Sequence, residues 1–455
     1  MGGISQIELG SAYQPKQEAR EALARDAQYA MDRAAHATAK HLLPTTSFRE
    51  IDAAMKRRDL TFDEAFVGMC YVLRATNRVF AAATEQHFTD LDGMDCRIAG
   101  REFLNGMAMK EAWGQLTPGE IAGMVTAAMQ DLVVRMPFSE SVLETCGTGG
   151  DLGLPPRDKP RKVINASTLS SLVVASLGIP TMKHGSYANT SAVGSTDAVE
   201  RFGARIEHRR VADLAAVFER SGFSYTDAHV VKTIHDLSHL APRHETVNHL
   251  IGPMTPPVAK EATLHKVMGV NEKVHPEDVA LAYQLIHGCG AQRIGNAAIV
   301  TGLDADIDAH RVCDRRLVKD HAVLDELSPF ASVVAFVRDG AYVGSHLMHL
   351  SDFGIGAMNG AIGIENTASL LQRANLDALT GRVPALTDYL AMNAGLALFV
   401  ARDMADEDAF CEGRGPNLDA LRGCVHECRR AIGDGRALDL LKRYVQATGG
   451  TFCGT

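Results

Sequence analysis

The feature that most constrains the fold is a glycine-rich loop followed by a polar helix start. The loop, Glu144-Thr-Cys-Gly-Thr-Gly-Gly-Asp151, has three glycines in four residues, so no Cβ shields this backbone from a ligand. Further on, Asn165-Ala-Ser-Thr168 opens an apolar run that ends at Gly178 and is typical of a helix. Because N–H groups in a glycine loop and at a helix start attract anions, the two motifs together predict a phosphate-binding site. For the loop alone, a plain glycine turn before a capped helix is the alternative.

The composition is that of an ordinary globular protein. Of 455 residues, 46% are hydrophobic and 22% are charged, and the formal net charge of -9 argues against a general nucleic-acid binder. We find no apolar run near the roughly 20 residues that span a bilayer, and no basic-then-apolar signal pattern at the N-terminus. Nine scattered cysteines, an odd number, indicate reduced thiols, and we therefore expect a cytoplasmic protein. Cys424 and Cys428 have no second pair nearby, which favours packed thiols over a metal site.

Changes in residue pattern predict the domain organisation. Residues 1–45 are rich in strong helix formers and predict a helical extension. Residues 46–140 predict an all-helical domain, to which part of 220–260 could belong. From 141 to 455, short apolar runs alternate with helical patterns, which indicates an α/β domain. Capping boxes mark two helix starts in the helical domain, at Thr61–Glu64 and Thr117–Glu120.

Three short stretches of the α/β domain give local predictions. Ile179–Met182 predicts a strand that places Lys183–Ser186 at its carboxyl end, where open α/β sheets bind ligands. Ser195–Asp197 predicts the cap of a helix, with Glu200 three residues on. Gly252–Pro257 contains three prolines and predicts a rigid turn between domains.

A buried strand and an acidic pair appear further along. Ala297–Gly302 predicts the strand, and the mixed-charge insert 304–320 follows it without a predicted role. Asp325 and Glu326 are then adjacent on a loop. Such hard oxygen ligands suit Mg²⁺, which keeps several waters and shares phosphate oxygens with a substrate. An exposed acidic turn is the alternative, and the upstream glycine loop favours the metal site.

The order of the motifs carries a family resemblance. The series is Gly147–Asp151, Asn165–Thr168, Lys183–Gly185, Gly194–Asp197, Leu250–Thr255 and Leu324–Ser328. It resembles anthranilate phosphoribosyltransferases and, more distantly, the pyrimidine nucleoside phosphorylases of the same fold. The resemblance implies a small all-helical N-terminal domain plus a larger α/β domain with a central, mainly parallel sheet, of the nucleoside-phosphorylase-like type. It also implies a homodimer formed through the helical domain.

The resemblance further implies a reaction. Family members use 5-phosphoribosyl 1-pyrophosphate and Mg²⁺, and they displace pyrophosphate from C1 of the ribose. That step passes through a cationic state comparable to glycoside cleavage, so the site must mainly stabilise charge on the leaving group. Carried over residue by residue, the donor set is Gly147, Thr148, Gly149, Gly150, Asp151, Asn165, Ser167, Thr168 and Lys183; the metal set is Ser167, Asp325 and Glu326; the acceptor set is His184, Gly185, Ser186 and Arg243; and Lys183 and His184 are the expected catalytic residues.

The chain departs from the family pattern in three places. A basic insert, 152–164, separates Asp151 from Asn165 and could clamp substrate phosphate, cover the site or be a solvated loop. Ser186 stands where the family has Asn after Lys-His-Gly. The acceptor-side segment with its paired arginines is altered, although Arg243 could still bind a carboxylate through its two-pronged donor geometry. The donor half of the site is therefore predicted to be retained and the acceptor half rebuilt.

Three functions fit the sequence. The first is Mg²⁺-dependent phosphoribosyl transfer to an aromatic or heterocyclic nitrogen acceptor, anthranilate or a related compound. The second is nucleoside phosphorylase-type glycosyl transfer, which has less need of the Asp325–Glu326 pair. The third is a non-catalytic, family-like nucleic-acid-binding protein, for which only the basic cluster at 157–162 speaks.

Overall fold

The computed structural model describes most of the chain from Ser47 onward. The predicted extension 1–45 and Arg243 lie outside the described residues. The described residues are 47–76, 80–81, 95–131, 135–136, 140–188, 191–206, 211–228, 247–358, 362–411 and 415–454.

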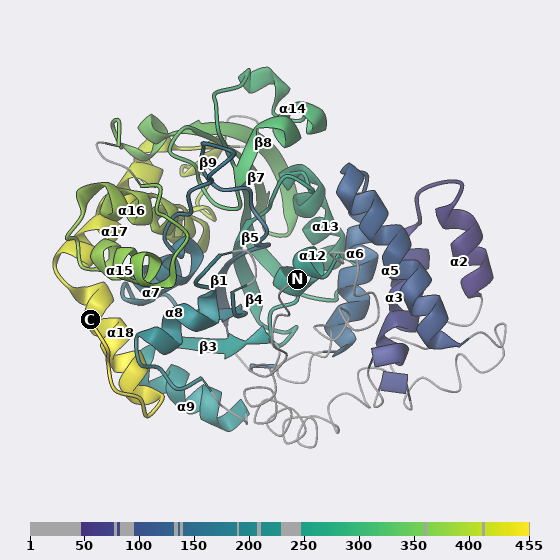
Figure 1. Ribbon diagram of the computed structural model, residues 1–455, viewed down its shortest axis with the longest axis horizontal. Coiled ribbons are helices and arrows are strands. Elements are labelled where there is room, and N and C mark those ends of the chain that lie inside the picture. The colour runs from purple at the N-terminus through teal and green to yellow at the C-terminus, as the bar shows by residue number, and fades with distance from the viewer. Residues whose placement is uncertain are drawn as a thin grey trace, which may run out of the picture.

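A helical region forms one end of the molecule (Figure 1). Both predicted capping boxes are present in it: Thr61 Oγ1 accepts the Glu64 N–H at 3.3 Å, and Thr117 Oγ1 accepts the Glu120 N–H at 3.3 Å. Glu120 is buried and also accepts from Lys110 Nζ at 2.5 Å, which ties two helices of the region together. The elements described in this region are α2 (Phe48–Met55), α3 (Phe62–Thr76), α5 (Cys96–Trp113), α6 (Pro118–Ala128) and the short η1 (Met129–Asp131).

A mixed sheet forms the centre of the larger part, with strand order β3-β2-β1-β4-β5-β7-β8 and β6 paired to β5. The strands from β3 to β5 pair in parallel, whereas β6 and β7 run antiparallel to β5, and β8 runs antiparallel to β7. The carboxyl ends of β1, β2 and β4 therefore meet at one edge. The strands are β1 (Ser141–Gly147), β2 (Thr181–Gly185), β3 (Phe223–Asp227), β4 (Thr263–Gly269), β5 (Ile294–Leu303), β6 (Ala322–Leu324), β7 (Ala331–Arg338) and β8 (Ala341–His349), with a separate pair β9 (Phe410–Cys411) and β10 (Gly415–Pro416).

Helices cover both faces of the sheet, as Figure 1 shows. One face contributes Val142 and Ile299 to a core shared with the helical region, and the other contributes Leu143 and Val300 to a core with the C-terminal helices. Alternation of side chains along each strand produces this division. The helices are α7 (Ala166–Ala175), α8 (Ser195–Arg201), α9 (Val211–Ser221), α12 (Asn248–Met254), α13 (Pro276–Gly288), α14 (Arg315–His321), α15 (Ala368–Leu379), α16 (Pro384–Leu398), α17 (Leu418–Gly433) and α18 (Arg436–Ala447), with short η3 (Ala309–Arg311), η4 (Leu350–Phe353) and η5 (Phe399–Asp403).

Three local predictions need correction. The predicted turn at Gly252–Pro257 is wrong in its first half, because Gly252–Met254 are the last residues of α12. The cap of α8 is Gly194 rather than Ser195, and Asp197 accepts the Gly194 N–H at 2.9 Å. Strand β2 begins at Thr181 and continues through Gly185, so Lys183 and His184 lie within the strand. Each error is a boundary shift of a few residues, where local propensity is least informative.

One stretch is longer and more apolar than the sequence reading allowed. Residues Pro384–Asp403 form 20 helical residues with mean hydropathy 1.2, which is enough by length and composition to cross a membrane. However, 83% of the apolar window is buried inside the protein. It contacts α7 and α17, so it is a core helix of this fold.

Candidate active site

The glycine loop follows β1 at the carboxyl edge of the sheet. Gly149 and Gly150 have φ angles of +69° and +71°, values that favour glycine. The loop is fixed from the neighbouring strand: the Thr148 N–H donates to Gly269 O at 3.0 Å, and Asn271 Nδ2 donates to Gly149 O at 2.9 Å. The turn is thus held by β4 and the residues that follow it.

The acidic pair lies against this loop. The Gly149 N–H donates to Asp325 Oδ2 at 2.7 Å, although 176 residues separate the two. The structure therefore brings together the two motifs that the sequence predicted to share one site. This hydrogen bond also means that one N–H group of the loop already has a carboxylate acceptor.

Three glycines on adjacent strands make room for the acidic pair. A Cβ on Gly147 or Gly269 would overlap Asp325, and one on Gly302 would lie 2.5 Å from Glu326 O. Gly147 and Gly269 are register partners on β1 and β4. The loop that carries the two carboxylates therefore packs directly on bare backbone of the sheet edge.

Little positive charge lies near the carboxylates of this loop. Burial, followed by the negative charge of Asp151, raises the pKa of Asp325 to about 6. Burial and the charge of Asp325 raise the pKa of Glu326 well above its ordinary value. Tyr389 on α16 donates a hydrogen bond to Glu326 Oε1 at 3.4 Å. Among the residues that the structure describes, Asp325 and Glu326 form no ion pair.

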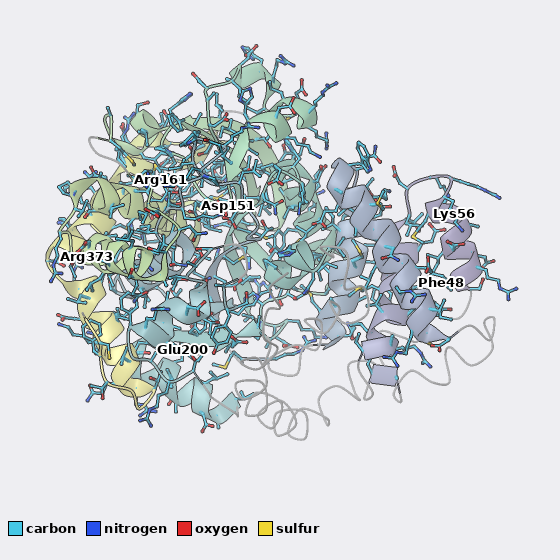
Figure 2. The ribbon with its side chains drawn as sticks, in the orientation of Figure 1. Phe48, Lys56, Asp151, Arg161, Glu200 and Arg373 are labelled. Atoms are coloured by element: carbon cyan, nitrogen blue, oxygen red, sulfur yellow. The ribbon has the colours of Figure 1, made fainter. Side chains whose placement is uncertain are left out.

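Asp151, the last residue of the loop motif, does have a cation. Lys162 Nζ donates to Asp151 Oδ1 at 2.7 Å and to Asp151 O at 2.9 Å. The two side chains are 10% and 13% exposed. Figure 2 marks Asp151 within the larger part of the molecule, away from Phe48 on α2.

The start of α7 lies beside the loop strand. Thr145 Oγ1 on β1 donates to Ser167 O at 2.6 Å. Asn165 precedes the helix but gives it no side-chain cap, and its Oδ1 accepts from Asn375 Nδ2 at 2.7 Å instead. Thr168 is fully buried, and within the described structure its hydroxyl has no hydrogen-bond partner. The Ala166 N–H of this helix start donates to Ile164 O at 2.7 Å, and the Thr168 hydroxyl is enclosed by the protein, so a ligand would meet the N–H groups that follow in the first turn.

Lys183 and His184 lie on β2 and are both buried. Lys183 Nζ donates to Thr145 O at 3.0 Å, and burial lowers its pKa. The His184 ring is engaged at both nitrogens, Nδ1 with Glu144 and Nε2 with Gly252 O at 3.0 Å. The geometry in this structure gives His184 contacts that position β2, and its predicted contact with an acceptor stays a prediction.

Glu144 is the centre of a buried network. Its second carboxylate oxygen accepts from Lys266 Nζ on β4, and Lys266 also donates to Pro253 O at 2.7 Å. Burial alone would raise the pKa of Glu144, but the charges of His184 and Lys266 outweigh it and hold that pKa below its ordinary value. The network joins β1, β2 and β4 to the end of α12.

The predicted acceptor residues lie at the end of β2. A Cβ on Gly185 would come 2.7 Å from Ser195 Cβ, so glycine allows α8 to approach the strand. Ser186 Oγ donates to Tyr187 O at 3.3 Å. Tyr187 OH donates to Glu200 at 2.9 Å.

Several residues of this site were missed by sequence reasoning. Lys266 on β4 and Asn271 just after it lie outside the motifs of the family resemblance, whereas Lys162 belongs to the basic insert that the sequence had already placed next to the phosphate site. Tyr389 belongs to an apolar helix and gave no signal. Cys424 and Cys428 are buried free thiols, and Cys424 Sγ donates to Asp403 Oδ2 at 3.1 Å.

Comparisons with known proteins agree with this architecture. A family model described as "Glycosyl transferase family, a/b domain" matches residues 139–319. The anthranilate phosphoribosyltransferase of Stenotrophomonas maltophilia is 31% identical over 358 residues, which cover 76% of this chain and 86% of that protein. The one from Xanthomonas axonopodis pv. citri is 30% identical over 418 residues, covering 89% and 98%.

Solved structures show the same fold. Anthranilate phosphoribosyltransferase from Thermus thermophilus has a TM-score of 0.60 at 22% identity, covering 88% of this chain and 99% of that chain. The Saccharomyces cerevisiae enzyme in complex with PRPP and Mg has a TM-score of 0.59 at 17% identity, covering 92% and 98%. The predicted fold class, a helical N-terminal part plus a larger α/β part with a mainly parallel sheet, is confirmed.

Proposed function

The chain belongs to the anthranilate phosphoribosyltransferase family, and we propose that it transfers ribose 5-phosphate from 5-phosphoribosyl 1-pyrophosphate to an aromatic or heterocyclic nitrogen acceptor. Pyrophosphate is the other product. The acceptor is anthranilate or a related compound. The observation that carries the proposal is the 2.7 Å hydrogen bond between the Gly149 N–H and Asp325, which joins an anion-binding loop to a metal-binding type of carboxylate pair.

The carboxylate pair fits Mg²⁺. Asp325 and Glu326 are half-buried, and among the described residues neither forms an ion pair. Two carboxylates supply only part of a coordination shell, which suits an ion that keeps waters and binds substrate phosphates. Bound there with Ser167 as a further oxygen ligand, Mg²⁺ would neutralise charge on the leaving diphosphate.

The chain's own residues do the remaining work on the donor. The N–H groups of Gly150 and of the first turn of α7 bind phosphate oxygens. Asn165 keeps the helix start in place through its bond to Asn375. Lys183 holds β1 and β2 together through Thr145 O and adds positive potential beneath the loop. These groups are fixed before substrate binds, so little reorganisation accompanies the reaction.

The acceptor is placed from β2. We propose that the Glu144 network fixes His184, and with it the turn Gly185–Ser186, so that the acceptor nitrogen faces C1 of the ribose. Arg243 would bind a carboxylate of the acceptor. The domain boundaries at 46–140 and 141–455 and the assignments of individual residues are parts of this proposal.

The two other functions find less support. Phosphorolysis of nucleosides has less need of the Asp325–Glu326 pair. Nucleic-acid binding rested on the basic cluster at 157–162, but Arg157 is paired with Asp304 at 3.2 Å and Lys162 with Asp151. Two of its positive charges are therefore occupied within the protein.

We also propose a homodimer formed through the helical region, in a cytoplasmic protein. Ile98, Met109 and Trp113 lie on one stripe of α5 and are 48%, 54% and 69% exposed. Apolar exposure of this kind on one helix face supports an interface. Eight cysteines in the described part of the chain are free thiols, which supports a reducing compartment. Sedimentation of Trp113→Glu beside wild type tests the dimer, which the variant should weaken.

The decisive test of function is a screen for pyrophosphate release. The purified chain is incubated with 5-phosphoribosyl 1-pyrophosphate, Mg²⁺ and a panel of aromatic amines, carboxylates and nucleobases. We expect release that depends on one class of acceptor and stops in EDTA. Release of a free base that requires phosphate and continues in EDTA would establish phosphorolysis instead.

A further inference from the structure

The basic insert 152–164 contains a hairpin, and Lys162 near its end faces the donor site. Leu154 and Arg161 pair as antiparallel partners, and the Lys162 backbone exchanges hydrogen bonds with Ile364 at 2.9 and 2.6 Å. These bonds fix the backbone of Lys162, so its side chain is directed by the fold. Its ammonium group ends on Asp151.

The tip of the hairpin makes its own contacts, with the insert 304–320. Arg157 is 64% exposed and donates to Asp304 Oδ2 at 3.2 Å and to Asp320 O at 3.1 Å. The insert 304–320 therefore supports the insert 152–164. Held at its tip by Arg157 and at its base by Ile364, the hairpin keeps Lys162 beside the glycine loop.

The charge around Lys162 is unbalanced. Lys162 pairs with Asp151, and Asp325 accepts from the N–H of Gly149, two residues before Asp151, so several carboxylates gather at the loop where Lys162 ends. A nearly buried ion pair contributes little net stability, because desolvation offsets the attraction. An ammonium group also has three N–H donors, and the two hydrogen bonds to Asp151 use at most two of them.

We propose that Lys162, delivered by the hairpin 152–164, is a further diphosphate-binding residue of this enzyme. Its ammonium group donates to an oxygen of the leaving diphosphate on the side of Asp151, next to the metal held by Asp325 and Glu326. The inference rests on the proposed function and adds to it a positive group that the motifs of the family resemblance do not contain. The ribose 5-phosphate end of the donor binds elsewhere, at α7.

The test compares two halves of the donor on the full chain. Calorimetry measures the binding of pyrophosphate with Mg²⁺, and separately of ribose 5-phosphate, to wild type, Lys162→Met and the charge-matched control Lys159→Met. Lys159 lies on the same hairpin and is exposed. A charge-assisted hydrogen bond is worth about 1.5–3 kcal/mol, so Lys162→Met should weaken pyrophosphate binding on the order of 10- to 100-fold. Ribose 5-phosphate binding should not change.

The dependence of pyrophosphate binding on salt distinguishes a direct contact with Lys162 from a long-range effect of its charge. A long-range charge effect falls steeply between about 0.1 and 0.5 M salt, whereas a direct, shielded contact persists. We expect the loss in Lys162→Met to persist and the small loss in Lys159→Met to disappear. If Lys162→Met does not fold, as judged by urea unfolding, Lys162→Gln replaces it, since it keeps a donor and removes only the charge.

The outcomes are distinct. Equal effects of Lys162→Met and Lys159→Met, or equal loss of both donor halves, overturn the role of Lys162 while leaving the proposed function intact. Absence of pyrophosphate binding and release in the wild type overturns the proposed function itself, and this inference falls with it.

Discussion

Two carboxylate sites near the edge of one sheet differ in the positive charge beside them. Glu144 on β1 is paired with Lys266 and His184, and its pKa is held below its ordinary value. Asp325 lies against Gly147, three residues further along the same strand, and its pKa is raised to about 6. Glu144 is fully buried and Asp325 only partly, yet the pKa of Asp325 is the one that is raised, so the difference comes from the partners.

This contrast distinguishes a carboxylate that stabilises the fold from carboxylates that bind a ligand. A buried carboxylate with its own cations is satisfied by the fold alone, and its removal should damage the fold. A carboxylate that is removed from water without a cation of its own destabilises the fold, and it indicates that a cation or ligand binds from outside. Glu144 therefore serves mainly to hold the strands, and Asp325 and Glu326 serve to bind.

The largest effect should follow neutralisation of the binding site. In Asp325→Asn combined with Glu326→Gln, we expect pyrophosphate release to fall by at least about 10³-fold, because charge on the leaving group loses its stabilisation. Unfolding in urea should occur at the same or a higher urea concentration, since two partly buried carboxylates without an ion-pair partner are removed. Turnover near that of wild type would show that the pair does not bind the metal.

The converse substitution should damage stability. Glu144→Gln leaves Lys266 buried without its carboxylate, and breaking such a pair costs about 3–5 kcal/mol. Urea unfolding of the metal-free protein measures this loss. If Glu144→Gln were as stable as wild type, the two sites would not differ in the way the contrast states.

A glycine between the two sites tests how closely they are packed. A Cβ on Gly269 would overlap the Asp325 backbone, and overpacking of this kind costs about 1–3 kcal/mol. We expect Gly269→Ala to lose both stability and Mg²⁺-dependent turnover. Gly288→Ala is the matched control, because a Cβ there meets open space, and its effect should stay within about 0.5 kcal/mol.

The difference in unfolding free energy between wild type and Glu144→Gln should decrease in acid. The folded pKa of Glu144 lies below its unfolded value, so its contribution is complete above about pH 4.5 and is lost as pH falls toward the folded pKa. The gap should therefore be constant from pH 7 to 5 and shrink below 4.5, by at most about 1.4 kcal/mol per pH unit. Urea unfolding of both proteins across this range measures it, and a gap that widened in acid would reverse the assigned sign.

Much of the fold followed from local sequence signals. The capping boxes at Thr61 and Thr117 were read correctly because a cap depends on residues three apart. The run Ala297–Gly302 lies within β5, because a short continuous apolar run is itself a local signal of a buried strand. The end of α12 was misread because Pro253 normally terminates a helix, whereas here it lies within the last turn and its carbonyl accepts from Lys266.

The site was only partly legible from the sequence. The glycine loop and the acidic pair stand out by composition, and the resemblance ordered them. Partners such as Lys266 for Glu144, or Tyr389 for Glu326, are set by strand order and helix packing between distant segments. No local pattern encodes such contacts, so only the folded chain shows which carboxylate has a cation and which does not.

The smallest effect should come from Tyr389, a residue of the core helix α16 that contacts the proposed metal ligand Glu326. Its hydroxyl donates to Glu326 Oε1 at 3.4 Å, a long bond worth about 0.5–1 kcal/mol. Tyr389→Phe should raise the Mg²⁺ concentration for half-maximal turnover by roughly 2- to 5-fold, because Glu326 loses orientation, while the KM for the acceptor stays unchanged. Tyr444→Phe is the control, since that buried hydroxyl has no hydrogen-bond partner in the described structure. A shift in acceptor KM without a shift in Mg²⁺ dependence would instead place Glu326 on the acceptor side of the site.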